Sequence, residues 1–463
     1  MKKTVLLLIS LFLITFSYGQ DVIGTWSGEL SVPNVIKLNI VFHISKTSDG
    51  YSTLLDSPDQ GVKGIPAGLT LFENNTLSIS MPAMGASYKG ELKADGKLYG
   101  TFSQGIDIPL NLEKGEAPEV KRPQEPQPPY PYKVEDVVFK NDKAGITLAG
   151  TLTIPSTSTK HPAIILVSGS GPQNRDEELM GHKPFLVIAD YLTREGFAVL
   201  RYDDRGVGKS EGAQKGATTA DFATDTEAAL AYLKTRTEIN PAKIGIIGHS
   251  EGGMIAFMLA AKNKDIAFII SMAGPGFRIQ DLMLKQAELV MKSNGMTESY
   301  WAIQEPVLRD RYAFITQDIP VSEIRNKLYN DVMETVPVNM HDNENVKSRV
   351  NAELDVMTSP WYISFMKYDP ADDLKNIKCP VFAINGEKDI QVPAELSLAA
   401  IERDIKNSGN KNVKTKQYPG LNHLFQRCTT CRVDEYGKIE ETISPEVLKD
   451  ISDWLKHLIN EML

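Results

Sequence analysis

The chain has no net positive charge, few cysteines and no apolar segment long enough to span a bilayer. Its 463 residues contain 50 Lys and Arg against 59 Asp and Glu, a formal net charge of −9. No basic run offsets that balance, which argues against nucleic acid or anionic lipid as the main partner. Only three cysteines occur. The pair Cys428 and Cys431 has CxxC spacing but lacks the two further ligands of a zinc site, so we expect no metal there.

The same two cysteines have three possible states: a local disulfide, a reducible pair or two free thiols. Export from the cytoplasm would permit a disulfide. We favour a structural disulfide between Cys428 and Cys431, with Cys379 left over as a core thiol.

The first twenty residues have the composition of a secretory signal peptide. Lys2 and Lys3 form a short positive region, an apolar run follows at residues 5–16, and small residues precede a cut between Gly19 and Gln20. The run is shorter than the ~20 residues that a membrane helix needs. We therefore expect a signal peptide at 1–19 and a mature protein that is soluble in a periplasm or outside the cell, without a membrane span.

Residues 20–114 have the pattern of an all-β domain. Short alternating runs recur between hairpin dipeptides such as Asp49-Gly50 and Asp95-Gly96. About eight such runs predict a small barrel or sandwich, with strands at 24–30, 35–44, 51–55, 69–72, 76–80, 88–92, 98–102 and 106–112. The opening Gly24-Thr25-Trp26 resembles the first strand of lipocalin-like barrels. The alternative is a Trp that simply packs in a small core.

A linker at 115–132 contains six prolines and predicts an extended, semi-rigid segment. From 133 to 463, apolar strands alternate with helical patterns, as in α/β folds. We expect strands at 134–140, 146–154, 163–167, 198–202, 243–248, 267–272, 381–385 and 413–418, and helices at 184–195, 220–235, 252–261, 394–406 and 445–462. Residues 277 to about 367 are Met-rich and helix-like, which predicts a helical cap over the site.

A G-x-S-x-G pattern around Ser250 is the strongest functional signal. It runs from Gly248 to Gly252, between a predicted strand and a predicted helix. Such a turn holds the serine in a strained conformation at the tip of a sheet, and the glycines remove side chains that would clash. The sequence therefore predicts Ser250 as a nucleophile rather than a chance match.

A serine needs a base, which is in turn oriented by an acid. In hydrolases with this serine turn the order is Ser…Asp…His. Among seven histidines, His423 lies in a loop late in the chain, and His182 is its competitor near the site. Asp389 ends the strand predicted before that loop, with Glu387 as the near alternative. His249 adjoins the nucleophile, so we expect its side chain to leave the turn in another direction.

The oxyanion of an acyl-transfer reaction needs two backbone N–H donors. We expect one from Glu251, the residue after the nucleophile. The other should come from the Gly-rich loop at 168–172, with Ser170 preferred and Gly171 as second choice.

Together these residues resemble the α/β-hydrolase superfamily over about 134–463. The run from Asp203 to Ser210 also resembles that superfamily's D-x-R-G-x-G-x-S turn. The chain is most similar to secreted bacterial esterases and serine aminopeptidase-like members. The resemblance implies an α/β-hydrolase fold with a helical cap, a Ser-His-Asp triad and no cofactor. Many relatives begin the oxyanion loop with His-Gly, whereas this chain has Ser168, so we expect different support for the loop.

The leading functional hypothesis is hydrolysis of small carboxylic esters through an acyl-enzyme. A second is a serine peptidase of aminopeptidase or prolyl-peptidase type, which would need an acidic cap residue such as Glu323, Glu334 or Glu353 to hold a free amine. A third is a ligand-binding protein with a vestigial hydrolase domain.

Overall fold

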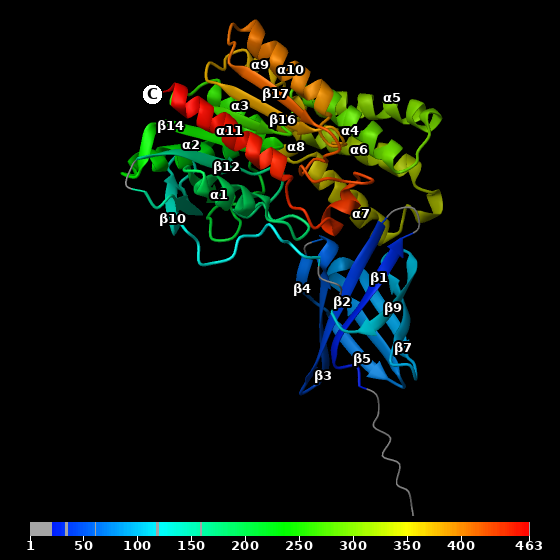
Figure 1. Cartoon of the computed structure of the whole chain (residues 1–463). Coiled ribbons are helices and arrows are strands. Elements are labelled where there is room, and N and C mark those ends of the chain that lie inside the picture. Colours follow the sequence, from blue (N-terminus) through cyan, green and yellow to red (C-terminus); the bar gives the residue numbers. More distant parts are fainter. Residues whose placement is uncertain (1–20, 33–35, 61, 117–119, 158–159, 463) are drawn as a thin grey trace, which may run out of the picture. The chain divides into compact units, whose positions relative to one another are not determined.

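The computed structural model describes residues 21–32, 36–60, 62–116, 120–157 and 160–462 (Figure 1). The predicted signal peptide at 1–19 and its cut before Gln20 lie outside the described residues. The described residues form two compact units: 21–32, 37–58 and 62–116 belong to the first, and 36, 59–60, 120–157 and 160–462 belong to the second. Within the described ranges, no helix combines the length and apolarity needed to cross a membrane.

The first unit is a closed antiparallel β-barrel of eight strands, as the alternating pattern predicts. Its strands follow in the ring order β2-β1-β9-β8-β7-β6-β5-β3, and β2 pairs again with β3 to close the ring. Their bounds are β1 (Gly24–Val32), β2 (Ile36–Thr47), β3 (Gly50–Ser57), β5 (Leu69–Glu73), β6 (Thr76–Met81), β7 (Ala86–Leu92), β8 (Leu98–Ser103) and β9 (Asp107–Lys114).

Alternate side chains of these strands fill the barrel. The strand β7 alternates buried and exposed residues along its whole length, as a strand with one face in a core must. Trp26 is buried in this core, and its indole Nε1–H donates to the carbonyl oxygen of Val22 at 2.7 Å. A further strand, β4 (Val62–Pro66), pairs with β3 outside the ring. The sequence pattern did not predict β4, because Gly64 and Pro66 are typical of a loop.

The second unit contains an eight-stranded sheet in the order β10-β11-β13-β12-β14-β15-β16-β17. The pairs β10–β11 and β11–β13 are antiparallel, and the remaining pairs are parallel. The strands are β10 (Lys133–Asn141), β11 (Ile146–Ile154), β12 (His161–Val167), β13 (Ala198–Tyr202), β14 (Ile239–His249), β15 (Ile269–Met272), β16 (Val381–Gly386) and β17 (Val413–Tyr418).

Helices cover both faces of this sheet. Residues of α2 (Thr219–Thr235), α3 (Glu251–Ala260) and α10 (Ala394–Asn407) share one core with alternate strand residues. Residues of α1 (Pro184–Arg194) and α11 (Pro445–Glu461) pack on the opposite face. Two packed layers around a mainly parallel sheet are the expected α/β architecture.

The cap consists of helices, as predicted, and has a core of its own. It contains α4 (Ile279–Ser293), α5 (Glu298–Ile315), α6 (Val321–Thr335), α7 (Glu344–Met357) and α8 (Pro360–Lys367). A single turn, α9 (Ala371–Leu374), follows and was not predicted. Cys428 and Cys431 form a disulfide, the state favoured from the sequence.

Candidate active site

Ser250 occupies the sharp turn between β14 and α3. Its backbone has φ 52° and ψ −117°, a conformation that a residue with a side chain adopts only under strain. A Cβ atom on Gly248 would lie 2.0 Å from the carbonyl oxygen of Gly252, and one on Gly252 would lie 2.1 Å from that of Val167. The two glycines therefore allow the turn to close against the end of β12.

The strand order explains why a cavity forms at this turn. The strand β12 lies between β13 and β14 in the sheet. The next strand in the chain, β13, therefore lies on one side of β12, and the strand after that, β14, lies on the other. Val167 at the end of β12 is in register with Gly248 near the end of β14. The loops after both strands therefore meet at a topological switch point, where open α/β sheets bind their ligands.

His423 and Asp389 come from the loops after β17 and β16. His423 Nδ1 lies 2.7 Å from Asp389 Oδ2, and both residues are buried. The other carboxylate oxygen of Asp389 accepts hydrogen bonds from the backbone N–H groups of Gln391 and Val392, at 2.8 and 2.9 Å. With Nδ1–H donating to Asp389, Nε2 is the basic nitrogen of the ring. Ser250 and His423 line one cavity.

The two competing side chains lie elsewhere. Glu387 is exposed and accepts a hydrogen bond from the N–H of Gly420 at 2.9 Å. His182 is buried between the hydroxyl of Thr442 and the carbonyl oxygen of Tyr436, at 3.0 and 2.9 Å. Burial lowers the pKa of His182 to about 4, so the ring is neutral near pH 7. It is not one of the residues that line the cavity.

The predicted oxyanion donors both belong to residues at this cavity. Ser170 lines it from the loop after β12, and Glu251 lines it from the start of α3. The first N–H groups of a helix have no acceptor within the helix, which suits an anion. The backbone of Gly169 runs so close that its Cβ would lie 3.3 Å from the Cβ of Ser250.

The turn after β13 supports the loop 168–177. Ser168 Oγ donates to Asp204 Oδ1 at 2.9 Å, and the N–H of Gln173 donates to Oδ2 at 3.0 Å. Burial raises the pKa of Asp204 to about 7, against the lowering effect of those two hydrogen bonds. Arg175 binds Asp203 with two side-chain N–H groups, at 3.0 and 2.7 Å.

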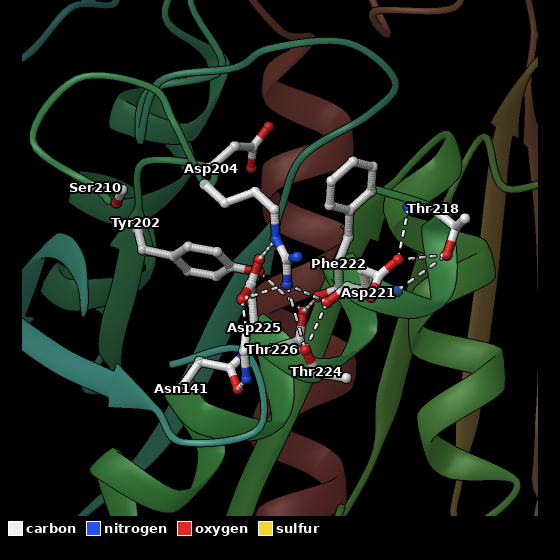
Figure 2. Close-up of polar contacts among 12 residues, drawn as sticks. Asn141, Tyr202, Asp204, Ser210, Thr218, Asp221, Phe222, Thr224, Asp225 and Thr226 are labelled. Carbon is white, nitrogen blue, oxygen red and sulfur yellow. Dashed lines mark hydrogen bonds and ion pairs between the residues drawn. The ribbon is translucent and has the colours of Figure 1, made fainter. Parts of the chain in front are cut away.

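A buried ion pair anchors the same turn to α2. Arg205 Nε lies 2.7 Å from Asp225 Oδ2, and Arg205 Nη2 lies 2.9 Å from Asp225 Oδ1. Figure 2 shows that Asn141 lies beside this carboxylate and also contacts the hydroxyl of Thr224. Asn141 Nδ2 donates to Asp225 Oδ1 at 2.7 Å. The D-x-R-G run thus fixes the turn to α2 on one side and to the loop 168–177 on the other.

Glu177 and His249 form a second buried pair, which the sequence analysis missed. Glu177 Oε1 accepts from the N–H of Gly169 at 2.8 Å and lies 2.9 Å from His249 Nδ1. His249 Nε2 is 3.1 Å from the carbonyl oxygen of His423. Burial alone would lower the pKa of His249, but the charge and hydrogen bond of Glu177 raise it above its ordinary value.

The cavity has a volume of about 260 Å³ and a largely apolar wall. Its polar side chains include three glutamines, Ser170, Ser250, Tyr362, two histidines and two glutamates. The carboxylate Oε1 of Glu251 accepts from Thr219 Oγ1 at 2.6 Å and from the indole Nε1–H of Trp361 at 2.9 Å. The lining residues are Gly169, Ser170, Gln173, Glu177, Leu179, His249, Ser250, Glu251, Pro275, Leu282, Met283, Gln286, Trp361, Tyr362, Phe365, Gln391, Val392, His423 and Leu424.

The acidic cap residues considered for a peptidase do not reach this cavity. Glu323 and Glu334 on α6 and Glu353 on α7 are exposed, and none of them is among the lining residues.

Comparison with known proteins places this site in a family. The family described as "Serine aminopeptidase, S33" matches residues 183–427, a range that includes Ser250, Asp389 and His423. The chain is similar to Esterase EstD of Thermotoga maritima, with 24% identity over 311 residues that cover 65% of each chain. It is also similar to the bifunctional esterase/perhydrolase DCH of Acinetobacter calcoaceticus, with 27% identity over 240 residues, 50% of this chain and 77% of that protein.

Solved structures show limited likeness. A hypothetical protein, PA2218, from Pseudomonas aeruginosa has a TM-score of 0.46 at 19% identity and covers 74% of this chain and 98% of that one. The esterase Pf2001 of Pyrococcus furiosus has a TM-score of 0.44 at 18% identity and covers 74% of this chain and 99% of that one. Because the family match spans more than half of the chain, the protein belongs to the serine aminopeptidase S33 family of α/β-hydrolases.

Proposed function

We propose that this serine hydrolase cleaves carboxylic esters through a triad of Ser250, His423 and Asp389. The observation that supports this most directly is the 2.7 Å contact between His423 Nδ1 and Asp389 Oδ2, at the cavity that the strained Ser250 also lines. The family and the similarity to EstD are consistent with such chemistry.

The proposed reaction has two halves. His423 Nε2 removes the proton from Ser250 Oγ, which attacks the ester carbonyl carbon, and Asp389 stabilises the imidazolium. The N–H groups of Ser170 and Glu251 bind the oxyanion. His423 returns its proton to the departing alcohol, leaving an acyl group on Ser250. Water, deprotonated by His423, then hydrolyses the acyl-enzyme and restores the serine.

The charges at the cavity favour esters over peptides with a free amino terminus. An aminopeptidase needs a carboxylate available to the substrate's ammonium group. Glu177 and Glu251 are the acidic side chains among the described lining residues, and each is buried and already bonded by two donors. All of these bonds are to Oε1, and binding a substrate ammonium at either carboxylate would move its charge from water into a buried site, which costs free energy.

The test is hydrolysis of p-nitrophenyl acetate, butyrate and octanoate by the wild-type protein and by Ser250→Ala, His423→Ala and Asp389→Asn. We expect kcat to fall at least about 10⁴-fold for the first two and roughly 10³–10⁴-fold for the third. His457→Ala is the control, because that ring is 75% exposed on α11. Full activity of Ser250→Ala would contradict the proposal. A wild type that is inactive on esters but binds a fluorophosphonate at Ser250 would favour the peptidase.

We also propose that the protein is exported and that residues 1–19 are removed. The support is the sequence of that segment, a positive start followed by a short apolar run. Expression of the full chain in a bacterium, with fractionation and N-terminal sequencing, tests it. Mature protein outside the cytoplasm that begins at Gln20 is expected, and an uncleaved cytoplasmic protein would contradict it.

A further inference from the structure

The cap helix α8 contributes three aromatic side chains to the catalytic cavity. Trp361, Tyr362 and Phe365 all line it. The rings of Trp361 and Phe365 stack with centroids 5.3 Å apart and an interplanar angle of 22°, and Tyr362 meets Trp361 edge to face at 6.1 Å. These side chains form one aromatic wall, which leucines or methionines at the same positions would not provide.

The plane of the Trp361 ring is fixed on two sides. Its Nε1–H donates to the buried carboxylate of Glu251 at 2.9 Å, and Phe365 stacks on the ring. A wall that is already ordered does not lose side-chain entropy when a ligand binds. Flat, ordered aromatic surfaces gain most from another aromatic ring in an offset or edge-to-face arrangement.

The rest of the cavity sets the charge and size of the group that it can take. Lysine and arginine are absent from its described lining, and Glu177 and Glu251 are buried, each with its Oε1 accepting from two internal donors. The other polar side chains include His249, which is paired with Glu177, and the neutral amides of Gln173, Gln286 and Gln391. An apolar cavity of about 150 Å³ holds a benzene molecule, so about 260 Å³ has room for one ring and a short ester.

We infer that the cavity selects uncharged esters that carry an aromatic ring, which packs against the wall of Trp361, Tyr362 and Phe365. This inference rests on the ester-hydrolase function proposed above and names the substrate class of that site.

The test compares matched esters whose rings have the same number of carbon atoms and differ in flatness. Ethyl phenylacetate and ethyl cyclohexylacetate place the ring in the acyl group, and benzyl acetate and cyclohexylmethyl acetate place it in the alcohol. Proton release at constant pH gives kcat/KM for each. We expect the aromatic ester of at least one pair to be favoured by about two- to tenfold, the range that aromatic contacts provide. The favoured pair shows on which side of the ester bond the ring binds.

Substitution of Trp361 links that preference to the wall. In Trp361→Leu the aromatic-to-saturated ratio should fall toward one, because Trp361 is the ring that contacts both Tyr362 and Phe365, whatever happens to the absolute rates through the lost bond to Glu251. Trp361→Phe keeps a ring without the N–H and should retain part of the ratio. Trp301→Leu is the matched control, because this second cap tryptophan does not line the cavity, and both its rates and its ratio should match the wild type.

The outcomes separate this inference from the ester-hydrolase proposal. A wild type that cleaves p-nitrophenyl acetate through Ser250 but treats both members of each pair alike would overturn the inference alone. A ratio that survives Trp361→Leu would also overturn it. A wild-type protein that hydrolyses none of the esters would overturn both proposals.

Discussion

Two buried side chains, Glu177 and His249, join the loops that carry a proposed oxyanion donor and the proposed base. Glu177 binds the N–H of Gly169, and His249 reaches the carbonyl oxygen of His423. A carbonyl oxygen only accepts hydrogen bonds, so Nε2 of His249 carries a proton. The proton between Nδ1 and Glu177 completes a link between the two loops. Ser250, which follows His249 in sequence, lines the same cavity as Gly169 and His423.

Removing this link should slow the reaction more than it weakens substrate binding. Glu177→Ala leaves the N–H of Gly169 and the ring of His249 without their acceptor. We expect kcat for p-nitrophenyl butyrate to fall roughly 10- to 100-fold, with KM changed little, because small displacements of reacting groups have effects of that size. Glu177→Gln keeps an acceptor and should recover most of the loss. Glu178→Ala, at an exposed neighbour, is the control, and a kcat for Glu177→Ala within twofold of wild type would refute the role.

Asp204 should make stability depend on pH. Its pKa is about 7 in the folded protein and about 3.9 in the unfolded chain. Between these values the folded state binds the extra proton, so the free energy of unfolding falls as pH rises from about 4 to 7, by at most about 1.4 kcal/mol per pH unit. Asp204→Asn cannot titrate, so its stability relative to wild type should rise across this window. Urea denaturation at pH 5 and pH 8 measures this, and a constant difference between the two proteins would contradict it.

Single residues were predictable where their signal is local. Ser250 stands in a five-residue pattern between a strand and a helix. His423 and Asp389 were selected by chain order, and the structure brings their side chains into contact. Glu177 offered no such signal, because it follows the loop at 168–172 in a polar run that looks like an ordinary surface segment. Its role depends on His249, 72 positions away.

At the scale of secondary structure, a buried ion pair joins the turn after β13 to α2. The side chains of Arg205 and Asp225 are 9% and 3% exposed. Removing one partner of a buried pair leaves the other charge unpaired. Arg205→Met should therefore lower the free energy of unfolding by about 3–5 kcal/mol.

Denaturation with urea measures this effect against a surface pair. Lys449 and Asp453 on α11 also form an ion pair, but their side chains are 68% and 56% exposed. Lys449→Met should cost less than about 1 kcal/mol. Equal losses of unfolding free energy in Arg205→Met and Lys449→Met would contradict the prediction that the buried pair contributes more to stability than the surface pair.

Strands and helices followed from the sequence because their apolar residues repeat with the right period. The alternation in the barrel strands and the continuous apolar runs of the parallel sheet both predicted the observed elements. The exceptions are short. The strand β4 contains Gly64 and Pro66, and α9 has four residues, too few for a helical period to show.

At the scale of the whole chain, the proline-rich segment contributes to the hydrolase unit. Arg122 donates to the carbonyl oxygens of Met180, Gly181, Gly437 and Ile439, at distances between 2.7 and 3.1 Å. These carbonyls belong to two loops far apart in sequence. The number of prolines predicted an extended segment, but no local pattern indicates which carbonyls an arginine will bind.

This contribution predicts where a stable hydrolase unit begins. A chain that starts at Val120 keeps Arg122, whereas one that starts at Lys133 loses it and leaves four carbonyls without their donor. Hydrogen bonds to charged groups contribute about 1.5–3 kcal/mol each. We expect the melting temperature of the shorter chain to be lower by more than about 5 °C. Calorimetry measures this, and Arg122→Ala in the full chain should lower the temperature in the same direction. Equal melting temperatures would contradict the prediction.

In the proposed reaction, Ser250 carries the acyl group during ester hydrolysis. Mass spectrometry of the protein after brief reaction with p-nitrophenyl butyrate and an acid quench tests it most directly. We expect one added butyryl group, on the peptide that contains Ser250, and none in Ser250→Ala. Ester hydrolysis with no adduct at Ser250, or with an adduct on another residue, would contradict it.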